Sequence, residues 1–169
     1  MNLKLLPPLA RTGYRWLVTG ASSLQSLLLL GIRLYWGWGF FQTGKGKLMN
    51  LDRTTQFFHD LGIPLPGLNA TLAGATECFG GLLLLIGLAS RLTAIPLLFT
   101  MLIAYLTAES EALKAIFTEP DKFFGAAPFL FLAASAIVLV FGPGKISIDG
   151  LLERIFDKSC GNAPRPAAE

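Results

Sequence analysis

Four long apolar segments constrain this chain more than any other feature of its sequence. About 20 largely apolar residues are enough for a helix to cross the hydrocarbon core of a bilayer. A buried core helix of a soluble protein could account for one such segment, but not for four in succession. Of the 169 residues, 53% are hydrophobic and only 15% are charged, which is too apolar for an ordinary soluble domain. The sequence therefore predicts an all-α, integral membrane four-helix bundle within residues 24–142, with spans over residues 24–43, 68–89, 92–108 and 123–141.

Both ends of the chain predict short amphipathic segments outside the bundle. In residues 1–23, aromatic residues alternate with arginines, a pattern typical of a segment lying along the cytoplasmic membrane interface. Residues 143–169 follow a Gly-Pro-Gly stop signal and predict a short cytoplasmic helix and a tail. Between the first two spans, residues 54–61 predict a short helix ended by Gly62 and Pro64.

The distribution of basic residues predicts that both termini are cytoplasmic. Eight Lys and Arg residues fall on the side of the termini and five on the opposite side, and cytoplasmic loops carry the excess of positive charge. The net charge of +3 is then a topology signal and does not imply a nucleic-acid partner. Under this topology Cys78 and Cys160 lie far apart on the reducing side, so a structural disulfide is not expected.

Several cofactor classes lack the residues they need. The chain has one histidine, His59, no Cys-x-x-Cys and no Gly-x-Gly-x-x-Gly. A zinc site, bis-histidine haem ligation, a dithiol relay and a dinucleotide-binding turn are therefore not expected. A lone loop histidine is more often solvated than a ligand, and a thiol at lipid depth such as Cys78 should stay protonated. The roles of His59 and Cys78 remain open at this stage.

A charged pair inside the bundle is the main prediction from the residues alone. An arginine in the middle of a span costs about 2.5 to 3.5 kcal/mol of insertion free energy, so it needs a charged or polar partner or a functional role. At 100° per residue, one face of the first span carries Arg33, Gly37, Phe40, Gly44 and Lys47. Measured from the predicted span ends, Arg33 and Glu77 lie at similar depths, about 13 and 18 Å. We therefore expect Arg33 and Glu77 to form an ion pair.

Two interpretations of this pair are open. It could only fix helix register, since buried pairs often specify a fold without adding stability. Alternatively, it could belong to a pocket in which carbonyl oxygens of a quinone accept hydrogen bonds and its ring stacks on aromatic residues. The candidate polar residues are Arg33, Glu77, Lys47 and Arg91, and the candidate lining residues are Trp36, Gly37, Phe40, Gly81, Thr100 and Tyr105. No metal ligands and no catalytic residues are assigned.

The order of these motifs resembles the DoxX family of small membrane proteins. The shared features are "R33…G37…G44…K47-L48", "E77…G80-G81-LLLLIG87…R91-L92" and "GPGKISID" at residues 142–149, within residues 27–152. The resemblance implies four transmembrane helices in the plasma membrane of a prokaryote. By matching position it also implies that Arg33, Lys47, Glu77 and Arg91 are the family-type polar residues. One departure is Ala126, where many members carry an acidic residue early in the last helix.

The resemblance leaves two hypotheses for function. Members are similar to the small subunit of thiosulfate:quinone oxidoreductase, and others are linked to sulfur metabolism, quinone resistance and a membrane oxidoreductase complex. The first hypothesis is therefore a redox-associated subunit that binds a quinone, or a small phenolic or sulfur compound, beside other redox subunits. The second is a non-enzymatic membrane anchor, an assembly factor or a small-molecule carrier. Whether the protein is an enzyme is left open.

Overall fold

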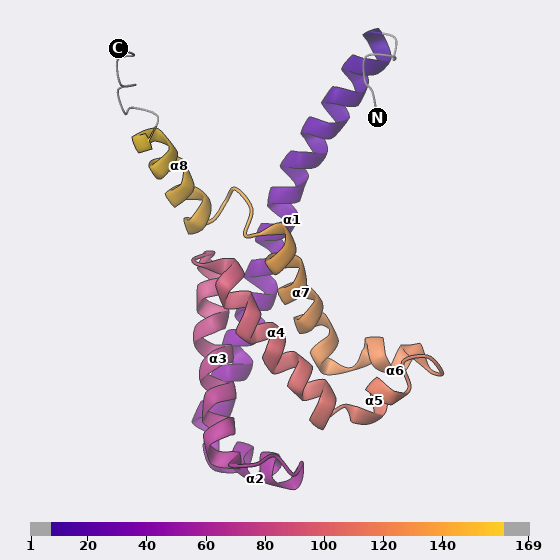
Figure 1. Cartoon of the computed structure of the whole chain (residues 1–169), viewed down its shortest axis with the longest axis vertical. Helices are drawn as coiled ribbons and strands as arrows, with labels where there is room; N and C mark the ends of the chain where they lie inside the picture. The colour runs from indigo at the N-terminus through magenta and orange to yellow at the C-terminus, as the bar shows by residue number, and fades with distance from the viewer. Residues whose placement is uncertain (1–7, 161–169) are drawn as a thin grey trace, which may run out of the picture.

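The computed structural model describes residues 8–160, which form helices and no strand. Figure 1 shows the helices in chain order, and their bounds are α1 Pro8–Met49, α2 Leu51–Asp60, α3 Pro66–Ile86, α4 Ser90–Thr107, α5 Ser110–Lys114, α6 Pro120–Gly125, α7 Ala127–Phe141 and α8 Ile148–Cys160. The bundle consists of α1, α3, α4 and α7, with α1 packed on α3, α3 on α4, and α4 and α1 on α7. One end of this bundle carries α2, α5 and α6, and the other carries α8.

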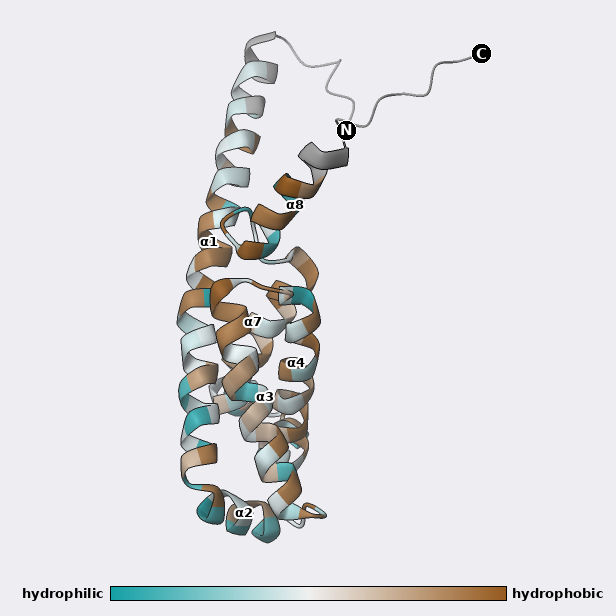
Figure 2. Ribbon diagram, turned by 90° about the vertical axis from the view of Figure 1, so that its left-hand side faces the viewer, coloured by the Kyte–Doolittle hydropathy of each residue, from teal (hydrophilic) through white to brown (hydrophobic). Residues whose placement is uncertain are grey.

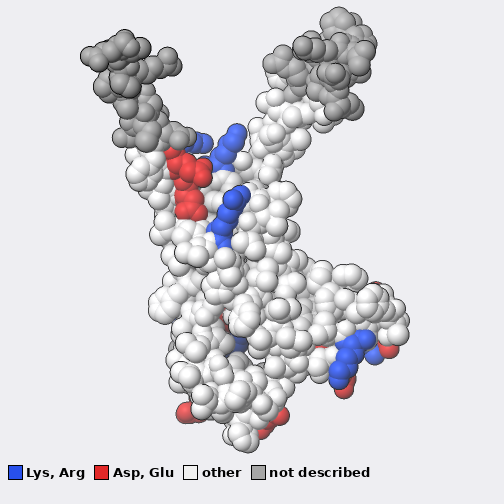
Figure 3. All heavy atoms as spheres, in the orientation of Figure 1, with Lys and Arg blue, Asp and Glu red and all other residues white. Residues whose placement is uncertain are grey.

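The apolar helices confirm an all-α membrane protein. Three of them, α1, α3 and α4, are long and apolar enough to cross a bilayer, and α7 is a shorter apolar helix of 15 residues. Apolar residues run along these helices in Figure 2, whereas α2 is largely hydrophilic. On the face drawn in Figure 3, most charged side chains gather toward the two ends, and only a little charge is visible between them, inside a hollow. This arrangement is the one expected of a bundle surrounded by lipid.

The last predicted span, over residues 123–141, is interrupted in the structure. Helix α6 ends at Gly125, Ala126 is extended with ψ of 139°, and α7 begins at Ala127. Pro128 explains the break, because a proline has no N–H and its ring clashes with the carbonyl four residues earlier in a helix. Alone, α7 rises about 22 Å, less than the roughly 30 Å of a hydrocarbon core. The count of four full spans was therefore not exact.

The first helix is much longer than the predicted span. No proline occurs between Pro8 and Met49, and α1 continues through all 42 residues. The separate segment predicted for residues 1–23 is, from Pro8 onward, the first part of this helix, while residues 1–7 lie outside the described residues. Figure 1 shows this part projecting past the end of the bundle. Because α1 passes beyond the end of α3, the residues of the two helices that lie side by side differ from those expected if the predicted span ends were level.

Glycines bring α1 and α3 into close contact. A Cβ atom at Gly44 would lie 2.2 Å from the backbone nitrogen of Cys78, and one at Gly81 would lie 2.5 Å from that of Phe41. Small residues of this kind let membrane helices approach without a hydrophobic driving force. The predicted face of α1 that carries Gly37, Phe40 and Gly44 therefore does pack against α3. Beside it lies a hydrophobic core made of Phe40, Leu84, Leu97, Met101 and Val138.

Candidate functional site

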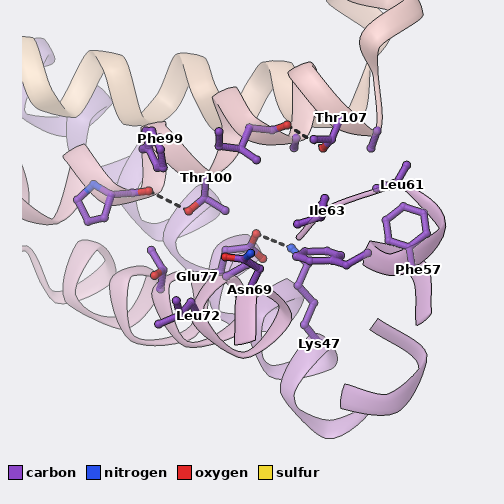
Figure 4. A pocket seen from close by; sticks show the side chains of 17 residues that line it. Lys47, Phe57, Leu61, Ile63, Asn69, Leu72, Glu77, Phe99, Thr100 and Thr107 are labelled. Carbon is purple, nitrogen blue, oxygen red and sulfur yellow. Dashed lines mark hydrogen bonds and ion pairs between the residues drawn. The ribbon is translucent and has the colours of Figure 1, made fainter. Parts of the chain in front are cut away.

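A pocket of about 580 Å³ lies between the end of α1 and helices α2, α3 and α4. Its volume is within the range of sites that hold small organic ligands. Figure 4 shows the side chains that line it, which are Lys47, Phe57, Phe58, Leu61, Ile63, Asn69, Leu72, Ala73, Thr76, Glu77, Pro96, Phe99, Thr100, Ile103, Ala104, Thr107 and Ala108. Most of them are apolar, so the few polar groups decide what chemistry the pocket can offer.

The charged group of this pocket is an ion pair between Lys47 and Glu77. The two side chains point toward each other in Figure 4, and Lys47 Nζ donates a hydrogen bond to Glu77 Oε1. The Glu77 side chain is fully buried, whereas the Lys47 side chain is 31% exposed. Glu77 Oε2 is also buried and has no hydrogen-bond partner. Because buried polar atoms are normally paired, this oxygen is an acceptor without its donor.

Other polar side chains of the pocket are engaged with the backbone. Thr100 Oγ1 donates to the carbonyl of Pro96 at 2.9 Å, and Thr107 Oγ1 donates to that of Ile103 at 2.8 Å. Asn69 Nδ2 donates to the carbonyl of Pro64 at 2.6 Å. These three donors are therefore occupied within the protein. Thr76 is a further polar lining residue, and the Lys47–Glu77 pair is the charged group of the pocket, with one buried oxygen unpaired.

Three phenylalanines supply the aromatic part of the pocket wall. Phe57 and Phe58 come from α2, and Phe99 comes from α4. Helix α2 packs against α3, and its phenylalanines form part of the pocket wall. The predicted short helix over residues 54–61 agrees with α2, yet its role in the pocket was missed. The Phe-Phe pair in an otherwise polar segment was the signal that could have found it.

The predicted pair between Arg33 and Glu77 was wrong. Arg33 is 1% exposed, and its Nη2 donates to the carbonyl of Ile146. Its guanidinium packs against Gly87, where a Cβ atom would lie 1.6 Å from Nη1. Gly87 is ten residues from Glu77, which corresponds to about 15 Å along a helix. The predicted depths failed because α1 extends past the end of α3, so the two predicted span ends are not level.

Arg33 instead belongs to a cluster that closes the opposite end of the bundle. The Asp149 carboxylate accepts hydrogen bonds from the backbone N–H groups of Ala89 and Ser90, at 2.7 and 2.8 Å. It thereby caps the start of α4 from a distant part of the chain, and its charge also attracts Arg33. The backbone N–H of Asp149 donates to Gly87 at 3.0 Å. The "GPGKISID" segment thus ties the middle of α1 to the end of α3 and the start of α4.

The other predicted site residues lie partly in and partly outside the pocket. Of the six predicted lining residues, Thr100 lines it. Gly37 and Gly81 form the α1–α3 contact, Phe40 lies in the core, and Tyr105 donates from its hydroxyl to the carbonyl of Phe123 at 2.8 Å. Trp36 lines a separate groove with Phe131, its edge-to-face partner. Arg91 is exposed, with Nη2 3.5 Å from the carbonyl oxygen of Val140.

His59 and Cys78 lie outside this chemistry. His59 is exposed and its Nδ1 lies 3.5 Å from the Asp60 carboxylate. Cys78 is a half-buried free thiol on α3 beside Gly44. Among the side chains that the structure describes, no three of the His, Cys, Asp or Glu type come together in a way that could hold a metal ion.

Comparisons with known proteins place the chain among its relatives. The family model DoxX matches residues 28–110. The protein named "Uncharacterized membrane protein Rv3486" from Mycobacterium tuberculosis is 33% identical over 135 residues, which cover 73% of this chain and 80% of the relative. The chain belongs to the DoxX family. A second relative, named "Putative oxidoreductase CatD" from Bacillus subtilis, is 30% identical over 118 residues, covering 70% of this DoxX chain and 81% of the relative. No solved structure matches this chain.

The part of the chain matched to DoxX contains the whole pocket pair but only part of the cluster around Arg33. Arg33, Lys47, Glu77 and Arg91 all lie within the matched residues 28–110. Asp149, which completes the cluster around Arg33, lies outside them. The pocket pair is therefore wholly contained in the matched region of this DoxX protein, as are all seventeen residues that line the pocket.

Proposed function

We propose that this DoxX protein is a redox-associated membrane subunit that binds a quinone, or a small phenolic or sulfur compound, in the pocket between α2, α3 and α4. The observation that carries the proposal is the Lys47–Glu77 pair, whose buried Glu77 Oε2 lacks a partner in a pocket lined mainly by apolar and aromatic side chains. Such a combination of an apolar wall and a few convergent polar groups is typical of small-molecule sites.

The chemistry of a small ring compound fits the pocket. Phe57, Phe58 and Phe99 can pack against an aromatic or quinonoid ring. The Lys47 ammonium carries three donors and gives one to Glu77, so it can also donate to a ring oxygen. Compounds of this class are apolar enough to enter from the lipid. The name of the Bacillus subtilis relative, a putative oxidoreductase, supports a redox association for that protein.

The small number of His and Cys residues, the types that ligate redox cofactors, favours a subunit over a self-sufficient enzyme. The sequence has one histidine and two cysteines, so electrons would pass between the bound compound and other redox subunits. A carrier is the weaker alternative, because the pocket occupies one end of the bundle while the Arg33–Asp149 cluster ties the other end together. A membrane anchor without a ligand would leave the unpartnered Glu77 oxygen unexplained.

Photoaffinity labelling of the full chain in nanodiscs tests the proposal. An azido-substituted quinone should label residues of the pocket wall, such as those of α4 between Pro96 and Ala108, as mapped by mass spectrometry. Lys47→Met, which removes the donor to a quinone oxygen, should lower the labelling at least about fivefold. The matched control is Lys122→Met, which removes an exposed lysine paired with Glu119 and should leave labelling unchanged. Labelling confined to other parts of the chain would contradict the proposal.

We also propose that the protein lies in the plasma membrane with both termini in the cytoplasm. The excess of Lys and Arg on the side of the termini supports this orientation. Single cysteines placed at His59 and at Glu153, in a chain in which Cys78 and Cys160 are serine, test it in intact cells. A membrane-impermeant maleimide should react at position 59 and spare position 153. The reverse result would invert the topology.

A further inference from the structure

We infer that the pocket selects ring compounds with a free hydroxyl, that is phenols and hydroquinones, over the same rings with only carbonyl or ether oxygens. The inference rests on the proposed function, because it concerns the same pocket, but it makes a separate statement about which ligand chemistry is preferred. It starts from a buried oxygen of the pocket that lacks a hydrogen-bond partner, Oε2 of the Glu77 carboxylate.

The empty position at Glu77 is an acceptor, and only a donor can fill it. An ionised carboxylate has two acceptor oxygens and no donor. Oε1 receives the hydrogen bond from Lys47, while Oε2 is buried and receives none. A ligand hydroxyl could donate to Oε2. A carbonyl or an ether oxygen would add another acceptor and leave Oε2 unsatisfied, at the cost that any buried unpaired polar atom carries.

Lys47 strengthens the preference for a hydroxyl over a carbonyl oxygen. Its side chain is 31% exposed and lies at the pocket wall beside Glu77. A hydroxyl oxygen can accept a hydrogen bond from the Lys47 ammonium while its proton points to Glu77, so it satisfies both groups. A quinone carbonyl can accept from Lys47 alone. The pair therefore offers two hydrogen bonds to a hydroxyl and one to a carbonyl.

The other donors near the pair do not compete for this position. The hydroxyl groups of Thr100 and Thr107 already donate to backbone carbonyls of α4, and the amide of Asn69 donates to Pro64. In Figure 4 the side chains of Glu77 and Lys47 meet at the wall, and Thr100 lies on the neighbouring helix with its bond directed back to that helix. Thr76 also lines the pocket, but its hydroxyl does not donate to Glu77 Oε2, which has no partner in the described residues. The missing donor of Glu77 is therefore expected to come from the ligand.

Matched pairs of ligands test the inference on the full chain in nanodiscs. We would measure equilibrium dissociation constants for 4-pentylphenol and its methyl ether, 4-pentylanisole, which differ in the single O–H. A second pair is 2-methyl-1,4-naphthohydroquinone, kept under anaerobic conditions, and its quinone. The hydroxyl-bearing member of each pair should bind at least about tenfold more tightly, as expected when a buried acceptor gains its donor.

Substitution of Glu77 should change the preference itself. In Glu77→Gln the side chain offers an amide N–H₂ group in place of one acceptor oxygen, so the two members of each pair should bind within about threefold of each other. Glu119→Gln, which alters an exposed carboxylate just before α6, should keep the tenfold preference. The wild-type comparison of phenol and ether needs no variant and decides the matter even if Glu77→Gln does not fold.

The possible outcomes separate the two proposals. Equal affinities of the phenol and its ether for the wild-type protein would overturn the inference and leave the proposed binding function standing. A preference for hydroxyls that persists in Glu77→Gln would also overturn it, because the preference would then arise elsewhere. If neither member of either pair binds, both the inference and the proposed function fail.

Discussion

At the scale of single residues, the pocket depends on two charges with unequal access to water. Glu77 is fully buried, whereas the Lys47 side chain is 31% exposed. Removing one partner of a buried pair is costly mainly when the remaining charge has no route to solvent. The ammonium of Lys47 can turn toward the headgroup region if its partner is lost. The carboxylate of Glu77 has no such route, so the two deletions should not be equivalent.

We therefore predict that Lys47→Met destabilises the fold more than Glu77→Gln. The lysine variant strands a buried carboxylate and should cost about 3 kcal/mol, while the glutamine variant should cost about half as much. Thermal unfolding of the purified protein in detergent measures both. Lys45→Met, which removes an exposed lysine of the same helix, serves as the control and should change stability by less than about 0.5 kcal/mol. A Glu77→Gln protein less stable than Lys47→Met would contradict this account.

The sequence predicted the row of residues that faces α3 but not which cation on that row reaches Glu77. Arg33 and Lys47 are fourteen residues apart, which returns them to nearly the same face of a helix. The helical period therefore cannot distinguish them. The choice depends on the axial offset between α1 and α3, and this offset is fixed by contacts such as that of Arg33 with Gly87. An axial offset between two helices produces no periodic pattern in the sequence, so it could not be predicted from helical spacing.

At the scale of helices, the α1–α3 contact holds the pocket pair in place. Gly44 lies one turn before Lys47, and a Cβ atom there would lie 2.2 Å from the nitrogen of Cys78 and 2.7 Å from the carbonyl oxygen of Gly74. Both neighbours are backbone atoms, which cannot move aside as a flexible side chain could. Helices α1 and α3 would have to separate. Lys47 of α1 and Glu77 of α3 would then move apart.

Gly44→Ala should therefore destabilise the bundle and weaken the pair, with a loss of about 2 kcal/mol or more, as for other overpacked contacts. Gly46→Ala is the matched control, because a Cβ atom at Gly46 meets nothing within 4 Å. That control should stabilise the protein slightly, by up to about 1 kcal/mol, since alanine is the better helix former. Thermal unfolding compares the two alanine variants directly. Equal stability would show that α1 and α3 are not in tight contact.

Helix existence was predictable from hydropathy, whereas helix ends were less so. The segments that became α3 and α4 were placed within two or three residues, and α3 ends at a strong local signal, Gly87. The long α1 and the break before α7 were missed. In α1 no residue marks the membrane boundary, and a helix continues in water and in lipid alike. At Pro128 the sequence carried the signal, but the surrounding apolar residues favoured one uninterrupted span.

At the scale of the whole molecule, the two ends of the bundle differ: a polar cluster joins the helices at one end, and the pocket lies at the other. One end joins α1, α3 and α4 through Arg33, Gly87 and Asp149. The other end is covered by α2 and contains the pocket with the Lys47–Glu77 pair. The pocket could not be foreseen from the membrane spans alone, because a wall of it comes from α2, a helix in a loop. The two charged residues of the pocket, Lys47 and Glu77, were both among the predicted family-type positions.

The central claim is that a small ring compound occupies this pocket with an oxygen beside Lys47 and Glu77. Its most direct test is an experimental structure of the full chain in nanodiscs, determined with a saturating concentration of a short-chain hydroquinone under anaerobic conditions. The account predicts ligand density between α2, α3 and α4, with one ring oxygen within about 3.2 Å of both side chains. An empty pocket, or a ligand found only in the groove beside Trp36, would contradict it.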